Sequence, residues 1–309
     1  MTPDFWSGKR VLVTGHTGFK GSWLAFWLSS LGAEVFGYAL EPDTEPNLFS
    51  QLKIGDLVTS VIGDIRDLDS VKRSFIESQP DIVFHLAAQS LVRRSYRLPV
   101  ESFETNVMGT VHVLEALRAV EAKAAVIVTT DKVYENDDLG RAYVEDDMLG
   151  GYDPYASSKA CAEIATAAYR RSFFSENKTP IIFSENKTRI ATARAGNVIG
   201  GGDWSEDRLL PDVFRSLVFG EPLTIRNPDA VRPWQHVLDP LNGYMTLAEK
   251  LCESGEFAEA WNFGPPADDA KPVSWVVDRL LENWGDAPHL QMSDGNHPHE
   301  SRRLSLYSS

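Results

Sequence analysis

Residues 13–21 read Val-Thr-Gly-His-Thr-Gly-Phe-Lys-Gly, and they carry the strongest structural signal in the chain. A short apolar run, 10–14, leads into them, and an apolar helical pattern, 22–31, follows. Glycine is needed where a chain turns sharply and where backbone approaches a pyrophosphate, and a following helix offers free N–H groups to the anion. The stretch therefore predicts a dinucleotide-binding loop, with a plain tight turn as the alternative. The loop residues expected at the dinucleotide are Gly15, Thr17, Gly18, Phe19, Lys20 and Gly21.

Outward from this loop, apolar runs rich in Val, Ile and Leu alternate with longer helical patterns over the first two hundred residues. Parallel strands need crossover connections, and strands without polar alternation fit a sheet that is buried on both faces. The pattern predicts an α/β fold with a doubly wound parallel sheet of the Rossmann type. The expected strands are 10–14, 34–40, 58–62, 82–86, 125–130 and 190–193, and the expected helices are 22–31, 68–78, 100–120 and 157–173.

The pattern loosens beyond about residue 200, where Gly, Pro, Trp and Asp become frequent. We expect a dinucleotide-binding domain over 1–195 and a smaller, irregular lobe over 196–309 that mostly binds substrate. Residues 174–179 recur as 183–188, a repeat too short for a repeat architecture, and we expect it to form a surface loop.

The composition excludes several classes of protein. The 309 residues include 30 Lys plus Arg and 44 Asp plus Glu, a net charge of −14, which argues against nucleic-acid and anionic-membrane partners. No apolar run approaches the roughly 20 residues of a membrane span. Cys161 and Cys252 lack metal-ligand spacing and are expected to be reduced thiols. With no apolar signal region before residue 10, a cytoplasmic protein is expected.

A second motif, Tyr155-Ala-Ser-Ser-Lys159, predicts redox chemistry at a carbon–oxygen bond. Residues four apart share one helix face, separated by about 6 Å of rise. An ammonium beside a phenol favours the phenolate, because it lowers the pKa of the phenol, which is about 10 when unperturbed. The phenolate can then take a proton from an alcohol while hydride leaves the same carbon. The alternative, a chance occurrence of the spacing, loses weight because the glycine loop lies upstream.

Together these motifs resemble the extended short-chain dehydrogenase/reductase family. The resemblance implies Thr130 as the third catalytic residue, which would hold the substrate oxygen for hydride transfer. It implies Asp64 as acceptor from the adenine amino group. NAD is the expected cofactor, and NADP stays open because Ala39 stands where an acidic ribose ligand is usual, with Glu41 two residues later. The further cofactor-binding residues that the resemblance implies are Ile65, Leu86, Ala87, Ala88, Gln89, Asn106, Tyr155 and Lys159.

The pair Asp131-Lys132 beside Thr130 narrows the resemblance to sugar-nucleotide 4,6-dehydratases, and Thr-Asp-Lys is similar to the CDP-glucose subfamily. The similarity covers most of residues 8–305. It implies a lyase of deoxysugar biosynthesis, such as that of lipopolysaccharide O-antigen. The implied reaction oxidises C4, removes water across C5–C6 and returns hydride to C6, giving CDP-4-keto-6-deoxyglucose.

In that reaction Asp131 must be protonated, and therefore buried, to protonate the departing C6 hydroxyl. Lys132 is a base only where desolvation removes its charge, and otherwise it stabilises the enolate electrostatically. A solvated Asp-Lys pair on a loop is the alternative interpretation.

The substrate residues expected at the sugar nucleotide are Gln89, Asn197, Arg208 and Arg232. Asn197 matches a family residue near the diphosphate, and guanidinium groups bind phosphate in a fork, although either arginine could lie on the surface. Trp204 and Trp234 either pack on the nucleotide or fill the lobe. His289, His297 and His299 form no convincing metal set, so no metal is expected.

The resemblance also implies a homodimer through the helices 100–120 and 157–173, and a further helical segment beyond residue 309. Two other functions stay open. One is another sugar-nucleotide 4,6-dehydratase or a 4-epimerase, and the other is an inactive dinucleotide-binding sensor, which the presence of both Tyr155 and Lys159 disfavours.

Overall fold

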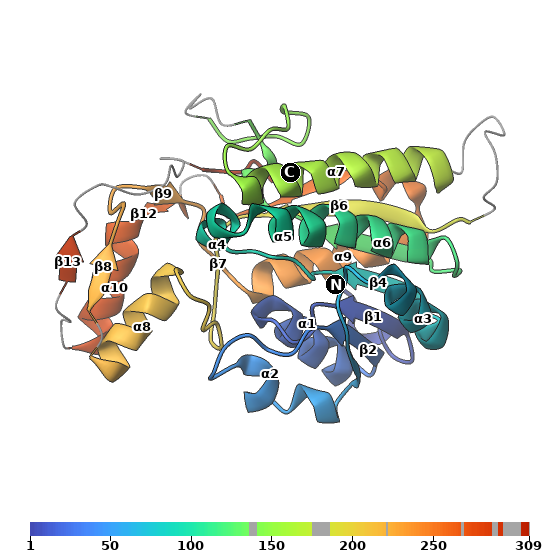
Figure 1. The fold of residues 1–309 in the computed structure, drawn as a ribbon, viewed down its shortest axis with the longest axis horizontal. Coiled ribbons are helices and arrows are strands. Elements are labelled where there is room, and N and C mark those ends of the chain that lie inside the picture. The colour runs from blue at the N-terminus through green and yellow to red at the C-terminus, as the bar shows by residue number, and fades with distance from the viewer. Residues whose placement is uncertain are drawn as a thin grey trace.

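A seven-stranded parallel sheet forms the centre of the molecule (Figure 1). The structure, a computed structural model, describes residues 1–135, 141–174, 186–220, 222–266, 269–285, 290–292 and 304–308. The strands of this sheet are β1 (Arg10–Thr14), β2 (Glu34–Ala39), β3 (Thr59–Ile62), β4 (Ile82–His85), β5 (Ala124–Val128), β6 (Arg189–Ala195) and β11 (Ala260–Phe263). Their order is β11-β6-β5-β4-β1-β2-β3, so the chain changes direction across the sheet between β1 and β4. Ligands of such folds bind at that point, outside the carboxyl ends of the strands.

Helices cover both faces of the sheet. On one face lie α1 (Phe19–Ser30) and α9 (Leu238–Glu253), and on the other lie α3 (Leu68–Ser78), α6 (Gly109–Leu117) and α7 (Pro154–Phe173). Successive β1 residues point to opposite faces, so Val11 packs with the α1 layer and Leu12 with the α3 layer. The predicted doubly wound Rossmann fold is confirmed.

The predicted helix over 100–120 is interrupted. The chain forms α4 (Val92–Arg97), α5 (Pro99–Phe103), a π-helical turn over Glu104–Met108, and then α6. Figure 1 shows α5 and α6 beside α7. The π-helical turn widens the helix at Asn106, which is buried, and single π turns often occur at functional sites.

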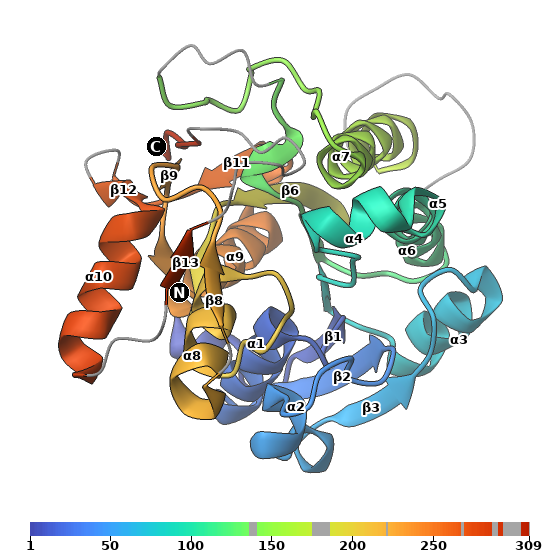
Figure 2. The ribbon, with the colours of Figure 1, turned by 60° about the vertical axis from the view of Figure 1, so that its left-hand side comes forward.

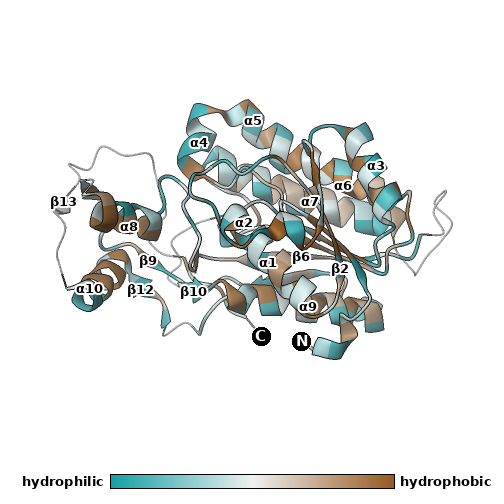
Figure 3. Ribbon diagram, turned by 90° about the horizontal axis from the view of Figure 1, so that it is seen from below, coloured by the Kyte–Doolittle hydropathy of each residue, from teal (hydrophilic) through white to brown (hydrophobic). Residues whose placement is uncertain are grey.

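The small lobe is attached at one end of the sheet, and α8 and α10 stand apart from the helices around the sheet (Figure 3). Its elements are α8 (Leu209–Phe219), β8 (Leu223–Ile225), β9 (Val231–Arg232), β12 (Lys271–Pro272), α10 (Val273–Trp284) and β13 (Leu290–Met292). Figure 2 shows these elements gathered opposite α3. A separate apolar core, built on Val213, Leu223, Ile225 and Val277, holds the lobe together. Short pairing of β7 (Val198–Ile199) with β10 (Gln235–His236) joins the lobe to the sheet domain.

Two elements from beyond residue 195 belong to the sheet domain. Strand β11 pairs in parallel with β6, and α9 packs on the sheet through Leu241, Tyr244 and Ala248. That the lobe over 196–309 mostly binds substrate stays a prediction. The sheet domain itself includes β11 and α9, which both lie beyond the predicted boundary at residue 195. Residues 175–185, which include most of the two copies of the six-residue repeat, lie outside the described residues. The remaining α-helix in the described part of the chain is α2 (Leu48–Gln51). No helix among the described residues has the length and hydropathy of a membrane span.

Candidate active site

Two adjoining cavities open at the carboxyl edge of the sheet. The first, here called the glycine-loop cavity, is lined by residues 15–21, the end of β2 and the segment after β4. The second, the lobe cavity, extends from the end of β5 to α8 and β8. Both cavities are lined by Phe19, Lys20, Leu86, Ala88, Ser90, Leu91, Asp203 and Arg208. Ligands in the two cavities would therefore lie next to each other.

The glycine loop forms one wall of the glycine-loop cavity, and its backbone is packed too closely for side chains. Gly15 has φ +78°, and a Cβ there would lie 2.7 Å from the Ala87 backbone nitrogen. A Cβ on Gly21 would overlap the carbonyl oxygen of Gly15. Gly18 is the N-cap of α1 and makes no side-chain cap, so no cap side chain occupies the first N–H groups of the helix. This cradle fits the pyrophosphate of a dinucleotide.

The predicted adenine contact lines the same cavity. Asp64 and Ile65 follow β3, and the Asp64 carboxylate accepts from the Arg66 guanidinium, with 2.6 Å between Oδ2 and Nη2. The hydrogen bonds from Arg66 hold the pKa of Asp64 below its usual value, so this carboxylate stays an acceptor. Glu41 also lines the cavity at the end of β2, where a carboxylate accepts from a ribose hydroxyl and disfavours an additional phosphate.

The segment after β4 lies along the cavity, and Leu86, Ala87, Ala88 and Gln89 all line it. The Gln89 side chain is engaged within the protein, donating to Ser102 Oγ at 2.8 Å and accepting from Leu91 N at 2.6 Å. Asn106 lines neither cavity, because its amide bonds the backbone N–H and C=O of Gln89, each at 2.9 Å. The structure thus places Asn106 behind the cofactor segment and Gln89 outside the lobe cavity.

Tyr155 and Lys159 line the lobe cavity from the first turns of α7. The helix begins there because Asp153 caps it, accepting from Ala156 N at 2.9 Å, and Pro154 occupies the first position. Lys159 Nζ donates to the carbonyl oxygen of Val128 at 3.0 Å, which ties α7 to the end of β5.

Burial has the largest effect on the pKa values of Tyr155 and Lys159. It raises the pKa of Tyr155 to about 12, and a hydrogen bond with Thr130 opposes only part of that rise. Burial lowers the pKa of Lys159 to about 8, with Glu163 opposing the fall. Burial thus outweighs the groups that favour the phenolate, and the phenolate, which we expect with the positive nicotinamide ring nearby, stays a prediction.

Thr130, Asp131 and Lys132 line the lobe cavity together with Tyr155. Thr130 caps a short 3-10 helix over Asp131–Val133, and its hydroxyl donates to Asp131 Oδ1 at 3.0 Å. Asp131 is only 1% exposed, so the alternative of a solvated pair does not hold for it. Within the described chain its Oδ2 is buried without a hydrogen-bond partner, in space left by Gly196, where a Cβ would lie 2.9 Å away.

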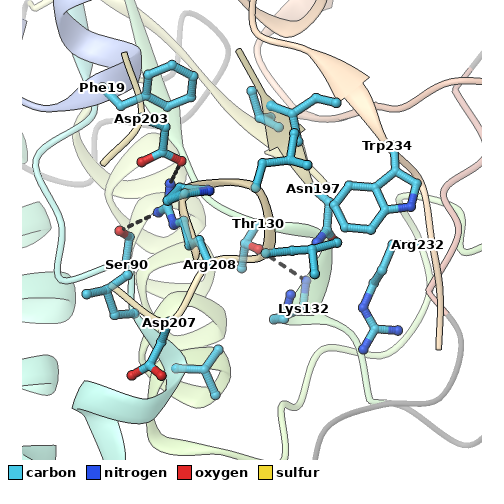
Figure 4. Close-up of a pocket in the computed structure, with 18 of the residues that line it drawn as sticks. Phe19, Ser90, Thr130, Lys132, Asn197, Asp203, Asp207, Arg208, Arg232 and Trp234 are labelled. Atoms are coloured by element: carbon cyan, nitrogen blue, oxygen red, sulfur yellow. Dashed lines mark hydrogen bonds and ion pairs between the residues drawn. The ribbon is translucent and has the colours of Figure 1, made fainter. Parts of the chain in front are cut away.

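Three polar residues expected at the sugar nucleotide lie along the lobe cavity (Figure 4). Arg208 donates to Asp203 Oδ2 at 3.0 Å and to Ser90 Oγ at 2.9 Å, at the boundary of the two cavities. Asn197 and Arg232 lie beyond Thr130, and Arg232 is 5% exposed. Three of the four expected residues, Asn197, Arg208 and Arg232, are thus brought together, while Gln89 is not.

Three further charged residues line the lobe cavity without any local sequence signal. Asp207, with φ +58°, accepts from Arg226 Nη2 at 2.6 Å and lies 3.6 Å from Arg93 Nη1. These residues come from α4, the loop before α8 and the loop after β8, so only the folded chain brings them together. They add two guanidinium groups to a cavity suited to a diphosphate.

Lys20 occupies the wall shared by the two cavities. Its Nζ donates to the Tyr244 hydroxyl at 3.3 Å. Burial, together with Arg208 and Lys159, lowers the pKa of Lys20 to about 7, although Asp131 acts in the opposite direction. An anionic ligand in either cavity would favour its charged form.

The tryptophans and histidines have separate positions. Trp204 lines the glycine-loop cavity and Trp234 the lobe cavity, where its Nε1 donates to Lys271 O at 3.0 Å. His289, His297 and His299 lie outside the described residues. Among the residues with described positions, no cluster of His, Cys, Asp or Glu could hold a metal ion.

A Rossmann sheet, a glycine cradle and a tyrosine–lysine–threonine set define a dinucleotide-dependent enzyme that acts on a carbon–oxygen bond. The model of the NAD dependent epimerase/dehydratase family matches residues 11–264. The chain belongs to this family, whose cofactor is NAD.

Known relatives agree with this assignment. The chain is 51% identical over 305 residues to "CDP-glucose 4,6-dehydratase" of Salmonella typhimurium, covering 98% of this chain and 84% of that protein. It is 30% identical over 303 residues to "dTDP-glucose 4,6-dehydratase" of Xanthomonas campestris pv. campestris, covering 94% and 80%. Among solved structures, UDP-glucose 4-epimerase of Thermus thermophilus with NAD superposes with a TM-score of 0.80 at 26% identity, covering 96% and 90%. A dTDP-glucose 4,6-dehydratase of Streptomyces venezuelae with NAD gives 0.79 at 25% identity, covering 96% and 88%.

Proposed function

We propose that the protein is a CDP-glucose 4,6-dehydratase, a hydro-lyase that converts CDP-glucose to CDP-4-keto-6-deoxyglucose. The observation that carries the proposal is the buried, unpaired carboxyl oxygen of Asp131 beside Thr130 and Tyr155. An epimerase needs only the alcohol/ketone centre, whereas a dehydratase also needs an acid for the departing hydroxyl. The similarity to the Salmonella protein, at 51% identity, supports cytidine as the nucleoside.

Each residue of the site has a separate role in the proposed reaction. Tyr155 takes the proton of the C4 hydroxyl while Thr130 holds the C4 oxygen by a hydrogen bond. Asp131 delivers a proton to the C6 hydroxyl as that group leaves. Lys132, on the same wall, accepts the proton that leaves C5 and returns a proton to C5 when hydride reaches C6. Bound at the glycine loop, NAD would supply the hydride acceptor for C4 and the hydride donor for C6, and a positive charge near Tyr155.

The cavities suggest how the ligands are divided. The glycine-loop cavity would hold NAD through the cradle of Gly15, Gly18 and Gly21, and Asp64 and Glu41 would accept from the adenosine. The lobe cavity would hold the sugar at Thr130 and the diphosphate at Asn197, Arg208 and Arg232. The separate apolar end of the lobe cavity, at Leu223 and Ile225, would accept the base.

The test is substrate profiling with NAD. We expect CDP-glucose, and not dTDP-, UDP- or GDP-glucose, to give a 4-keto-6-deoxy product, with solvent deuterium incorporated at C5. A product that retains the C6 hydroxyl and inverts C4 would identify a 4-epimerase. Binding of NAD and CDP-glucose without turnover would identify a sensor.

We also propose a cytoplasmic homodimer. The outer face of α5, the π-helical turn and α7 exposes Val100, Phe103, Met108 and Ile164, which is unusual for the surface of a monomer. Both cysteines are free thiols, as expected in a reducing compartment. Light scattering tests the dimer, and Ile164→Glu should dissociate it.

A further inference from the structure

An acidic residue, Glu163, follows the catalytic pair on α7. Tyr155, Lys159 and Glu163 follow one another at intervals of four residues, so they share one face of the helix. Glu163 is only 3% exposed and lines neither cavity. The mechanism above gives it no task.

The Glu163 carboxylate accepts three hydrogen bonds, one from the residue after β5 and two from β6. Thr129 Oγ1 donates to Oε1 at 2.5 Å, and Thr192 Oγ1 donates to Oε2 at 2.7 Å. Arg194 Nη2 donates to Oε2 at 2.9 Å, in an ion pair whose side chains are 4% and 3% exposed. A buried carboxylate is costly unless it is paired and hydrogen-bonded, and here both conditions are met.

The partners of α7 lie in consecutive positions at the end of β5. The Val128 carbonyl accepts from Lys159, the Thr129 hydroxyl donates to Glu163, and the Thr130 side chain meets Tyr155. Three residues of one strand end thus meet three residues of one helix face. A shift of the Glu163 carboxylate would move Thr129, and with it the adjacent Thr130.

Glu163 is also the acidic group that acts on Lys159. The charged and titratable groups facing Lys159 are Lys20 from α1, His85 from β4, and Glu163 from its own helix. Of these, Glu163 raises the pKa of Lys159, against the larger effect of burial. Without this carboxylate, the Lys159 ammonium would lose that support and Arg194 would be left without its counter-charge.

We infer that Glu163 is a positioning residue that fixes the Thr129–Thr130 strand end against α7 and supplies a negative charge one helical turn from the Lys159 ammonium. It acts from behind the site, through Thr129 and Lys159, and touches no ligand. The inference rests on the proposed function only for its turnover readout, because the protonation of Lys159 can be measured without substrate.

The first experiment measures the pKa of Lys159 directly. Competitive acetylation of the whole protein across pH 6–10, followed by mass spectrometry of the peptide that contains Lys159, gives its titration midpoint. In Glu163→Gln we expect this midpoint to fall by about one pH unit, since an opposite charge at such range shifts a pKa by at least that much. Thr192→Val is the matched control: it removes a hydrogen bond from the same carboxylate but no charge, and its midpoint should stay at the wild-type value.

The second experiment measures turnover of CDP-glucose. Glu163→Gln should shift the alkaline limb of the pH profile to lower pH, and Thr129→Val should lower kcat about tenfold without shifting that limb. Glu163→Asp keeps the negative charge, so the alkaline limb of its pH profile should stay at the wild-type pH. This variant is the one to measure if Glu163→Gln does not fold. An unmoved Lys159 midpoint in a folded Glu163→Gln protein would overturn the inference. Wild-type turnover of a different sugar nucleotide would refute the proposed function and leave the Lys159 result standing.

Discussion

The glycine-loop cavity and the lobe cavity are built in opposite ways. The first is shaped by backbone at Gly15, Gly18 and Gly21, all within one short stretch of sequence. The second is shaped by long charged side chains, among them Arg93, Arg226 and Arg232, from segments far apart in the chain. A backbone cradle suits a ligand common to a whole family, whereas side chains on short lobe elements can be exchanged to suit a particular sugar nucleotide.

The largest effect is expected where chemistry, rather than binding, is removed. Tyr155→Phe should lower kcat about a thousandfold, since general base catalysis is lost, while both cavities still bind their ligands. Turnover of CDP-glucose and separate titrations with NAD and CDP-glucose measure the three quantities. Tyr152→Phe, at an exposed tyrosine outside both cavities, is the matched control and should keep wild-type turnover. Retained turnover in Tyr155→Phe would remove the phenol from the mechanism.

A methyl group in the glycine cradle should damage one cavity only. Gly21→Ala should weaken NAD binding about a hundredfold, because its Cβ overlaps the Gly15 carbonyl and the loop must shift. CDP-glucose binding should change little in a calorimetric titration. Gly201→Ala is the control, since a Cβ there has nothing within 4 Å. Equal loss of both ligands would show that the cavities are not independent.

The converse change should damage the lobe cavity only. Arg232→Met keeps the length of the side chain but removes its charge, and CDP-glucose binding should weaken at least about tenfold. NAD binding should stay at the wild-type level in the same titration. Arg279→Met, at an exposed arginine on α10, controls for loss of a positive charge. Unchanged CDP-glucose affinity in Arg232→Met would place the diphosphate elsewhere.

The smallest effect concerns Lys20, which both cavities share. Its pKa is about 7 in the folded protein and 10.5 in an unperturbed chain. Between these values the unfolded state binds a proton that the folded state lacks, so the free energy of unfolding should rise with pH. The gain is at most about 1.4 kcal/mol per pH unit, and it should disappear in Lys20→Met. Urea unfolding of both proteins from pH 7 to 9 measures it. Parallel curves for the two proteins would contradict a depressed Lys20 pKa.

The first half of the fold could be predicted because its signals are local. Strand β1 runs over Arg10–Thr14, as predicted, and α3 over Leu68–Ser78, also as predicted. The start of α1 at Phe19 was less predictable, since its N-cap is Gly18 and no side chain marks the cap. Strand β11 has four residues, and its place beside β6 follows from tertiary packing rather than from its own sequence.

The residues of the candidate site also differ in whether the sequence could predict them. Tyr155 and Lys159 were predictable because their spacing places them on one helix face, whereas Thr130 was predicted only from the family resemblance; all three line the lobe cavity. Asp207 and Arg226 were not predictable, because their pairing depends on how the lobe folds over α4. The position of Asn106 behind Gln89 was also hidden, since the π-helical turn that carries it has no distinctive sequence.

The pairing of β11 with β6 has a consequence for dissecting the protein. A fragment that ended near residue 195 would contain every motif of the dinucleotide site, yet it would leave the backbone of β6 unpaired along a bare edge. Bare edges recruit other chains, so such a fragment would aggregate rather than bind NAD. An autonomous sheet domain therefore has to extend through Phe263. Because α8 and β8 precede β11 while β12 and α10 follow it, the lobe is built from chain on both sides of that strand and cannot be removed as a single tail.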